Sequence, residues 1–169
     1  NGGPLASRTF AASAPVENGI VTQLTVDRVA AAGRAHATKD GRQILQLDTW
    51  GHSLDGSPLV ADPVGTRADR IAAHHFVVTA DAQPVVNLTR TIGRCYLAAH
   101  RLVPGPIARA LAVTSEDERR HGIVTIDIGA AVTGVAMFQD GRAIFARTLP
   151  IGGGQVTLAQ VGEQRPPVA

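Results

Sequence analysis

The sequence predicts a mixed α/β chain built from two alternating units, and three observations favour this class. Apolar residues recur at helical spacing in some stretches, as in 22–37, and form short extended runs in others, as in 70–80. Gly, Pro and Asp-Gly pairs separate these stretches. At 169 residues, the chain is long enough for one core or two small lobes.

The first half is predicted to contain one helix among several strands. Thr22 can cap a helix that runs to about Ala37, because Thr is a common N-cap and the apolar residues that follow share one helical face. In order, the predicted elements are a strand or two in residues 1–17, this helix, a turn at 39–41, a strand over 43–48, a turn at 55–56, an extended piece over 59–64 and a strand over 70–80.

The second half is predicted to contain helices followed by a three-stranded meander. In order, the predicted elements are a helix with a mostly apolar face over 83–96, a short strand at 102–103, a helix over 106–113, a charged solvated face or loop at 115–120, a hairpin over 123–138, a strand over 142–149, a Gly break at 152–154 and a helix that starts at Gln155. Residues 161–167 look like a turn, which would leave the last helix very short.

Composition and charge exclude several classes of function. The formal net charge is +2, and acidic and basic residues are mixed, so no basic patch predicts a nucleic-acid partner. Cys95 is the single cysteine, which rules out a disulfide within the chain and fits a reducing compartment. No apolar run approaches the roughly 20 residues of a membrane-spanning helix.

The stretch IVTIDIGAAVTGVAMF, residues 123–138, carries the candidate site. Asp127 stands where the first strand ends, and Gly129 allows a ligand to approach the backbone. Successive amides in such a turn can converge on an anion, and Thr133 adds a hydroxyl. From the turn alone, a hairpin that binds phosphate and a plain hairpin of small residues both remain open.

Two other chemistries have weak support. Cys95 and His100 do not share a helix face at their spacing of five, and no G-x-S-x-G elbow occurs, which argues against a nucleophilic enzyme. His74 and His75 are adjacent in a predicted strand, so they point to opposite faces. No C-x-x-C or H-x-x-x-H spacing occurs, and no metal site is predicted.

Stretches spread over nearly the whole chain resemble the FtsA family of actin-like bacterial cell-division proteins. IVTIDIGAAVTGVAMFQDGRAIFARTLPIGG resembles the family's second phosphate hairpin with the following strand and glycine turn. SLDGSPLVADPVGTRADRIAAHHFVVTA resembles strands of the inserted 1C subdomain, and NLTRTIGRCYLAAHRLVPGPIARALAVTSEDERRHG resembles the lead into the second actin-like lobe. GGPLASRTF is similar to the end of the first lobe, and VGEQRPPVA to a distant part of the second.

The resemblance implies a fold and a division of the chain. It implies part of an actin-like (ribonuclease-H-like) lobe together with a small strand-helix-strand-strand subdomain. Residues 1–17 would end the first lobe, residues 18–80 would form the 1C interaction subdomain, and residues 81–169 would form part of the second lobe. Because the last stretch matches a distant part of the family, we also expect a segment to be absent near residue 160.

The resemblance also implies a function. The full-length protein would be a non-catalytic scaffold that links FtsZ filaments to the cytoplasmic face of the inner membrane at the division site. It would self-associate and recruit later division proteins through 1C, and a C-terminal helix absent here would contact the membrane. It would bind ATP with magnesium and be at most a weak ATPase. Two alternatives are an actin-superfamily phosphotransferase or phosphatase, and the actin-like scaffold of pilus assembly.

The site residues that the resemblance assigns are Asp127, Gly129, Ala130, Thr133, Gly152 and Gly153. Asp127 would order water around magnesium, the amides of the turn would face phosphate, and the later glycines would lie near the same ligand. The family pattern has glycine and threonine where this chain has Ala131 and Val132, so we expect a Cβ at 131 to oppose a positive φ. Because an actin-like site needs two such hairpins, we expect this chain alone to bind no ATP.

Overall fold

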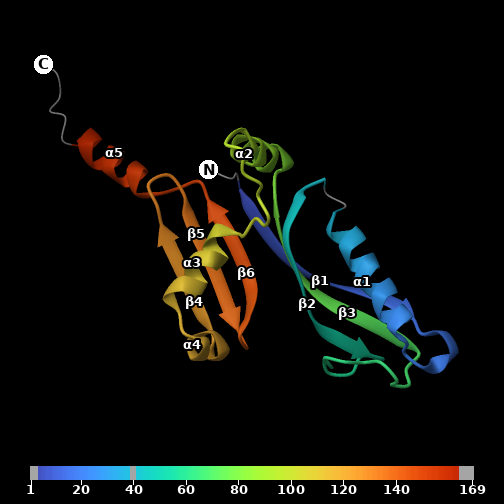
Figure 1. The fold of residues 1–169 in the computed structure, drawn as a ribbon. Coiled ribbons are helices and arrows are strands. Elements are labelled where there is room, and N and C mark those ends of the chain that lie inside the picture. Colours follow the sequence, from blue (N-terminus) through green and yellow to red (C-terminus); the bar gives the residue numbers. More distant parts are fainter. Residues whose placement is uncertain (1–3, 39–40, 164–169) are drawn as a thin grey trace, which may run out of the picture. The chain divides into compact units, whose positions relative to one another are not determined.

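The structure is a computed structural model that describes residues 4–38 and 41–163. The chain forms two compact units (Figure 1). The first comprises Ser7–Val103, and the second comprises Pro4–Ala6 and the described residues from Pro104 onward. The class is mixed α/β with two small antiparallel sheets, as the sequence predicts.

The first unit has the order strand, helix, strand, strand. Its elements are β1 (Leu5–Pro15), the short 3-10 turn η1 (Glu17–Gly19), α1 (Gln23–Ala37), β2 (Gln43–Leu54), β3 (Arg70–Ala80) and α2 (Ala82–Arg94). The sheet order is β1-β3-β2, and β2 and β3 are antiparallel, with Gln43 opposite Ala80 and Leu54 opposite Ile71. β1 therefore belongs to the same sheet as β2 and β3.

Helix α1 covers one face of this sheet (Figure 1). Its predicted cap is confirmed, because the Thr22 hydroxyl accepts a hydrogen bond from the Thr25 amide at 3.3 Å. Val29 is fully buried together with Ile71 and Ala73 of the central strand. The core of the first unit therefore lies between α1 and the middle of the sheet.

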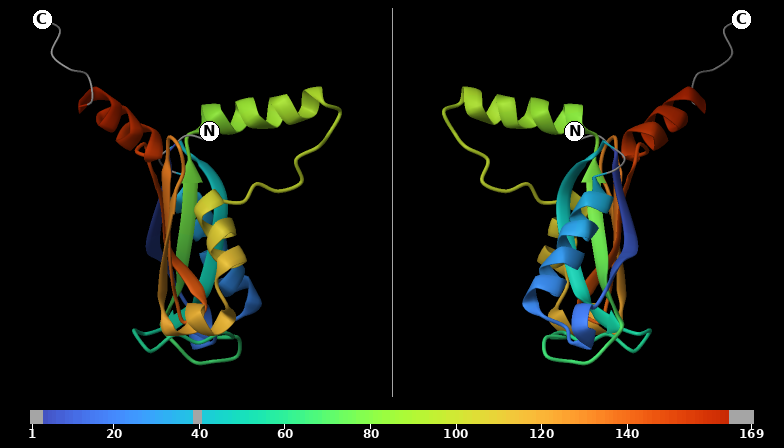
Figure 2. Two further views of the ribbon diagram at one scale, coloured as in Figure 1. Left: turned by 90° about the vertical axis from the view of Figure 1, so that its left-hand side faces the viewer. Right: turned by 90° about the vertical axis from the view of Figure 1, so that its right-hand side faces the viewer.

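Helix α2 forms as predicted, but no residue of it is buried. Figure 2 shows it projecting away from the sheet of its own unit. Val86 and Leu88 keep 37% and 45% of their surface exposed. The predicted apolar face of this helix is therefore present and uncovered within the described residues.

The second unit is a meander covered on one face by a helix. Its elements are α3 (Gly105–Val113), α4 (Glu116–His121), β4 (Ile123–Ile128), β5 (Thr133–Gln139), β6 (Arg142–Leu149) and α5 (Gly153–Glu163). The sheet order is β4-β5-β6, and both pairings are antiparallel. α3 packs on all three strands, and small buried residues on both sides, Ala110, Ala136 and Ala146, allow a close approach.

Several element predictions are wrong, for physical reasons. Residues 102–103 form no strand, because no strand pairs with them. The charged stretch is the helix α4, which begins with a capping box between Ser115 and Glu118 and has no buried residue, so the predicted solvated face is confirmed and the loop alternative is wrong. β2 extends beyond residue 48 to Leu54, where β3 still offers a pairing partner. Val60 makes only an isolated bridge with His52.

Helix α5 continues through the position at which the sequence suggested an absent segment. Residues 161–163 belong to the helix, so the prediction of a turn at these three residues is wrong. The remainder of that stretch, and residues 39–40 of the predicted turn, lie outside the described residues. The absent segment near residue 160 and the assignment of 1–17, 18–80 and 81–169 to parts of two lobes stay predictions.

Candidate functional site

The turn between β4 and β5 carries the predicted site residues at the end of the second sheet. Asp127 lies opposite Gly134, and the strands pair as far as Ile128 and Thr133. The Gly129 amide donates to the Val132 carbonyl at 3.0 Å and closes the turn. Ala131 is not among the residues with a positive φ, so the Cβ at this position causes no backbone strain here.

The glycine run at the start of α5 packs directly on this turn. The Gly153 amide donates to the Gly129 carbonyl at 2.8 Å, and the Gly154 amide donates to the Ala130 carbonyl at 2.8 Å. A Cβ on Gly152 would lie 2.4 Å from the Gly129 oxygen, a distance that no side chain tolerates. The structure thus brings Gly152 and Gly153 together with Gly129 and Ala130, and a ligand shared by these residues stays a prediction.

Side chains reinforce the contact between the turn and α5. The Thr133 hydroxyl donates to the Ile151 carbonyl at 2.7 Å. The Gln155 side-chain oxygen accepts from the Gly152 amide at 2.7 Å. Gln155 was not predicted as a site residue, although its place in the first turn of a helix after a Gly run is a signal for capping.

The hydrogen bonds decide which amides of the site are available to a ligand. Those of Gly129, Gly152 and Gly153 already donate to oxygens of the chain. Within the part of the chain that the structure describes, the amides of Ala130 and Ala131 have no acceptor, and both residues are exposed. These two amides are the donors that an anion at the turn would meet.

Asp127 is engaged by a residue that the sequence reasoning missed. The Nε atom of Arg109, on α3, lies 2.6 Å from Oδ2 of Asp127, and both side chains are about half exposed, at 55% and 43%. Arg109 is the single charged residue in the otherwise apolar sequence GPIARALAV of this helix. A lone charge in an apolar helix next to the candidate hairpin is a signal that could have identified it.

The remaining polar candidates have roles of their own. His75 is buried, its Nδ1 lies 3.1 Å from the Thr49 hydroxyl, and its pKa is lowered first by burial and then by His52 and His74. Glu118 accepts hydrogen bonds from the backbone and hydroxyl of Ser115, which lower the pKa of its carboxyl. Among the described residues, no three His, Cys, Asp or Glu side chains gather as a metal site would require.

Known proteins match this chain over most of its length. The model of a domain described as the SHS2 domain inserted in FTSA matches residues 2–79. The cell division protein FtsA of Agrobacterium fabrum is 30% identical over 155 residues, which are 92% of this chain and 35% of that protein. The chain belongs to the FtsA family. Its match to the SHS2 domain agrees with the strand-helix-strand-strand order of the first unit.

Other FtsA proteins support the same membership. The FtsA of Neisseria meningitidis serogroup B is 28% identical over 84% of this chain, and that of Escherichia coli strain K12 is 25% identical over 85%. This chain covers 34% of each of these two proteins, so it spans about a third of the length of its FtsA relatives.

A solved structure shows the same fold. The PilM-PilN type IV pilus biogenesis complex contains a chain that matches 94% of this one with a TM-score of 0.61, and this chain covers 44% of it. The two sequences are 16% identical, so this likeness concerns the fold alone. It confirms the predicted partial actin-like architecture. Among the described residues, no helix is both long enough and apolar enough to span a membrane.

Proposed function

We propose that the full-length protein is a cell-division scaffold that links FtsZ filaments to the cytoplasmic face of the inner membrane and recruits later division proteins. The observation that carries this proposal is the alignment of FtsA proteins with 92% of the chain, through both units. Self-association and membrane contact through a C-terminal helix beyond this chain belong to the same proposal.

The turn after β4 supplies half of an ATP site in this proposal. The free amides of Ala130 and Ala131 face the phosphates, and Thr133, Gly152 and Gly153 hold the turn in shape. The other half belongs to the first lobe of the full-length protein, so the 169-residue chain alone binds no ATP. Hydrolysis contributes at most a slow turnover, because nucleotide binding serves the scaffold and not a metabolic reaction.

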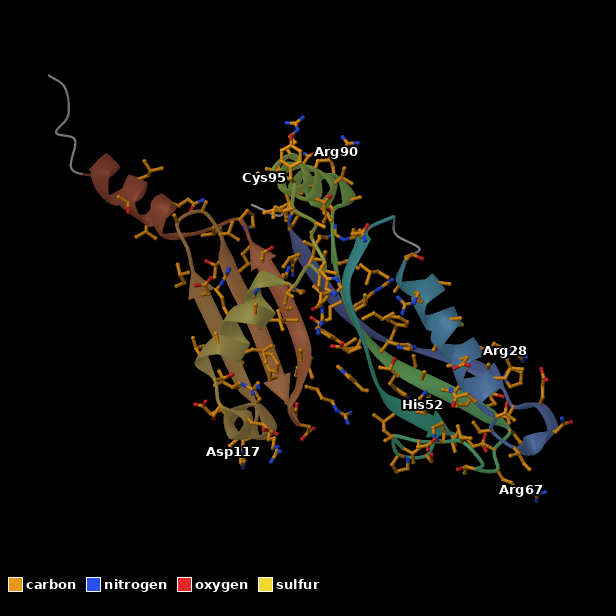
Figure 3. The ribbon with its side chains drawn as sticks, viewed as in Figure 1. Arg28, His52, Arg67, Arg90, Cys95 and Asp117 are labelled. Carbon is orange, nitrogen blue, oxygen red and sulfur yellow. The ribbon has the colours of Figure 1, made fainter. Side chains whose placement is uncertain are left out.

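The first unit, which matches the SHS2 domain, offers a surface for recruitment where α1 begins. Ile20, Leu24 and Val64 are exposed by 43%, 66% and 44%, and we call these three residues the α1 patch. The loop that contains Val64 is held beside the patch, because the Gly65 amide donates to the Val21 carbonyl at 2.9 Å. Arg28 on α1, which pairs with Glu17, and Arg67 lie toward the same end of the unit (Figure 3). An apolar patch with a polar rim is typical of a protein-binding surface.

Co-pelleting with lipid tests the scaffold. Full-length protein, purified FtsZ and vesicles of phosphatidylglycerol and phosphatidylethanolamine are centrifuged together and in pairs. We expect FtsZ to sediment with the vesicles only when the protein is present. The variant Leu24→Glu keeps this activity if the α1 patch serves later partners and not FtsZ. FtsZ that stays in the supernatant in all mixtures contradicts the proposal.

Two other functions make different predictions for the full-length protein. An actin-superfamily phosphotransferase or phosphatase would turn over at a rate typical of enzymes, about 10 per second, whereas the scaffold does not. A pilus-assembly scaffold has support from the fold it shares with the PilM-PilN complex. It would bind a PilN-type partner and leave FtsZ in solution, which the same pelleting assay detects.

A further inference from the structure

Arg109 of the second unit places a positive charge beside the turn, where it can balance the negative charge of a phosphate. Its Nε lies 2.6 Å from Oδ2 of Asp127, the carboxylate that the family pattern assigns to magnesium. Asp127 is two residues before Gly129, and it lies opposite Gly134 in the ladder. A positive charge therefore lies at the strand end from which the turn begins.

Gly105 leaves room for this guanidinium, and Gly134 lies beside it. A Cβ on Gly105 would lie 3.2 Å from Nη1 of Arg109, and a Cβ on Gly134 would lie 3.7 Å from Nη2. The contact at Gly105 would be tight with a side chain present, whereas the contact at Gly134 would be an ordinary one. Its two terminal nitrogens have no acceptor among the described residues and remain able to donate.

This arrangement does not fit a magnesium ion at Asp127. Magnesium requires a nearly ideal octahedron of oxygens and is usually held through carboxylates and water. One oxygen of Asp127 already pairs with a cation, and a second cation on the same carboxylate would be repelled by the first. A planar guanidinium, in contrast, can pair with a carboxylate and offer its remaining N–H groups to a phosphate.

We propose that Arg109 takes the place of magnesium as the cation beside this turn, so that the full-length protein binds the metal-free form of ATP. This inference rests on the proposed nucleotide site and names the form of nucleotide that the site takes. Arg109 pairs with Asp127 in the absence of ligand and turns its free N–H groups to the phosphates when ATP lies on the amides of Ala130 and Ala131.

Titration calorimetry of the full-length protein with ATP, in magnesium and in EDTA, tests the proposal. We expect the wild-type Kd to differ by less than about threefold between the two conditions, because the charge is balanced by the protein. Arg109→Ala should weaken binding in EDTA by about tenfold or more, the value of a hydrogen bond to a charged group. Added magnesium should restore much of this loss, since Asp127 is then free to order its hydration shell.

Two further variants complete the test. Asp127→Asn should leave metal-free binding intact or tighter, because Arg109 loses its competing partner. Arg120→Ala is the matched control, because Arg120 is similarly exposed, at 61%, and is paired with Glu116 on its own helix. It should leave both Kd values unchanged.

The outcomes separate this inference from the function on which it rests. Wild-type binding that weakens tenfold or more in EDTA overturns the role of Arg109, and so does an Arg109→Ala variant with wild-type Kd values in both conditions. In either case the nucleotide site itself still stands. If the wild-type protein binds ATP in neither condition, the proposed nucleotide site fails and the role of Arg109 fails with it.

Discussion

Gly152 is the residue whose contacts most tightly define the candidate site. Its missing side chain lets the start of α5 lie against the carbonyls of Gly129 and Ala130, with the nearest oxygen 2.4 Å from where a Cβ would be. Gly153, the next residue, would place a Cβ 3.8 Å from the same oxygen, which is an ordinary contact. Adjacent glycines therefore differ sharply in what they tolerate.

This difference predicts opposite results for two substitutions of the same size. Gly152→Ala should push α5 away from the turn and speed hydrogen exchange at the Gly153 and Gly154 amides, because overpacking against backbone costs about 1–3 kcal/mol. Gly153→Ala should leave exchange near the wild-type rate. Exchange measured by mass spectrometry on the 169-residue chain checks both, and equal protection in the two variants would show that the contact is not formed.

Ala131 and Val132 depart from the family pattern, and the structure separates their effects. Ala131 needs no positive φ here, so Ala131→Gly should change ATP affinity of the full-length protein little. Val132→Thr adds a hydroxyl at the turn and should tighten binding by about tenfold, the value of one hydrogen bond to a charged group. Calorimetry on both variants tests this, and a larger gain from Ala131→Gly would mean that the ligand-bound turn has a different backbone.

At the scale of elements, the contact between α1 and the central strand depends on one glycine and one histidine. A Cβ on Gly33 would lie 2.2 Å from Nε2 of His75, and that side chain is only 1% exposed. The His75 ring also lies against Phe10 of β1, with the ring centroids 5.2 Å apart and the planes tilted by 38°, so it has no room to move aside. The helix sits this close to the sheet because position 33 lacks a side chain.

Two Gly→Ala substitutions are therefore expected to change the free energy of unfolding in opposite directions. Gly33→Ala should lower the free energy of unfolding by about 1–3 kcal/mol, because the clash exceeds the gain in helix propensity. Gly93→Ala, in the exposed helix α2, meets nothing within 4 Å and should raise stability by up to about 1 kcal/mol. Urea unfolding followed by the single tryptophan, Trp50, which stacks on Phe76, reports on the first unit.

His75 also predicts a dependence of stability on pH. Burial keeps its pKa below the ordinary 6.5, so the folded unit holds the ring neutral. As the pH falls below 6.5, the unfolded chain takes up a proton before the folded one does, and stability is lost. The loss amounts to about 1.4 kcal/mol for each unit by which the pKa is lowered.

Urea unfolding of the chain at a series of pH values measures this effect. Between pH 7 and pH 5, the wild-type midpoint should fall, and His75→Asn should flatten the curve by removing the titrating ring. His121→Asn, at an exposed position on α4, should leave the slope unchanged. An identical slope in the His75 variant would assign the pH dependence to other groups.

The elements that could be predicted from the sequence are those with a local cause. Three predictions that depend only on neighbouring residues are confirmed: the α1 cap at Thr22, the strand β3 and the β4-β5 hairpin. The strand predicted at 102–103 does not form. A strand needs a pairing partner elsewhere in the chain, and the local sequence does not show whether that partner exists. At the site, the sequence predicts that Gly152 lies near the turn. The lone charge of Arg109 marks that residue in the sequence, but its pairing with Asp127 depends on how α3 packs on the sheet.

At the scale of the whole molecule, the chain spans about a third of its FtsA relatives, and one face of its second sheet is exposed within the part of the chain that the structure describes. Val124, Ile126 and Ile128 alternate along β4 with 49%, 64% and 70% of their surface exposed. α3 packs on this sheet over the opposite face, which includes Asp127 and Gly134. Such a row of apolar side chains on an edge strand is a surface that proteins normally cover.

We expect the remainder of the full-length polypeptide to cover this row, which predicts opposite effects of one substitution in the two contexts. Ile126→Lys should make the 169-residue chain more soluble, because it breaks the exposed apolar row. In the full-length protein the same lysine should be buried and lower stability by about 2 kcal/mol or more. Gln139→Lys adds the same charge at an exposed polar position and should do neither. Sedimentation of the short chain and thermal melting of the long one measure the two effects, and a full-length Ile126→Lys protein that melts at the wild-type temperature would mean that β4 stays uncovered there as well.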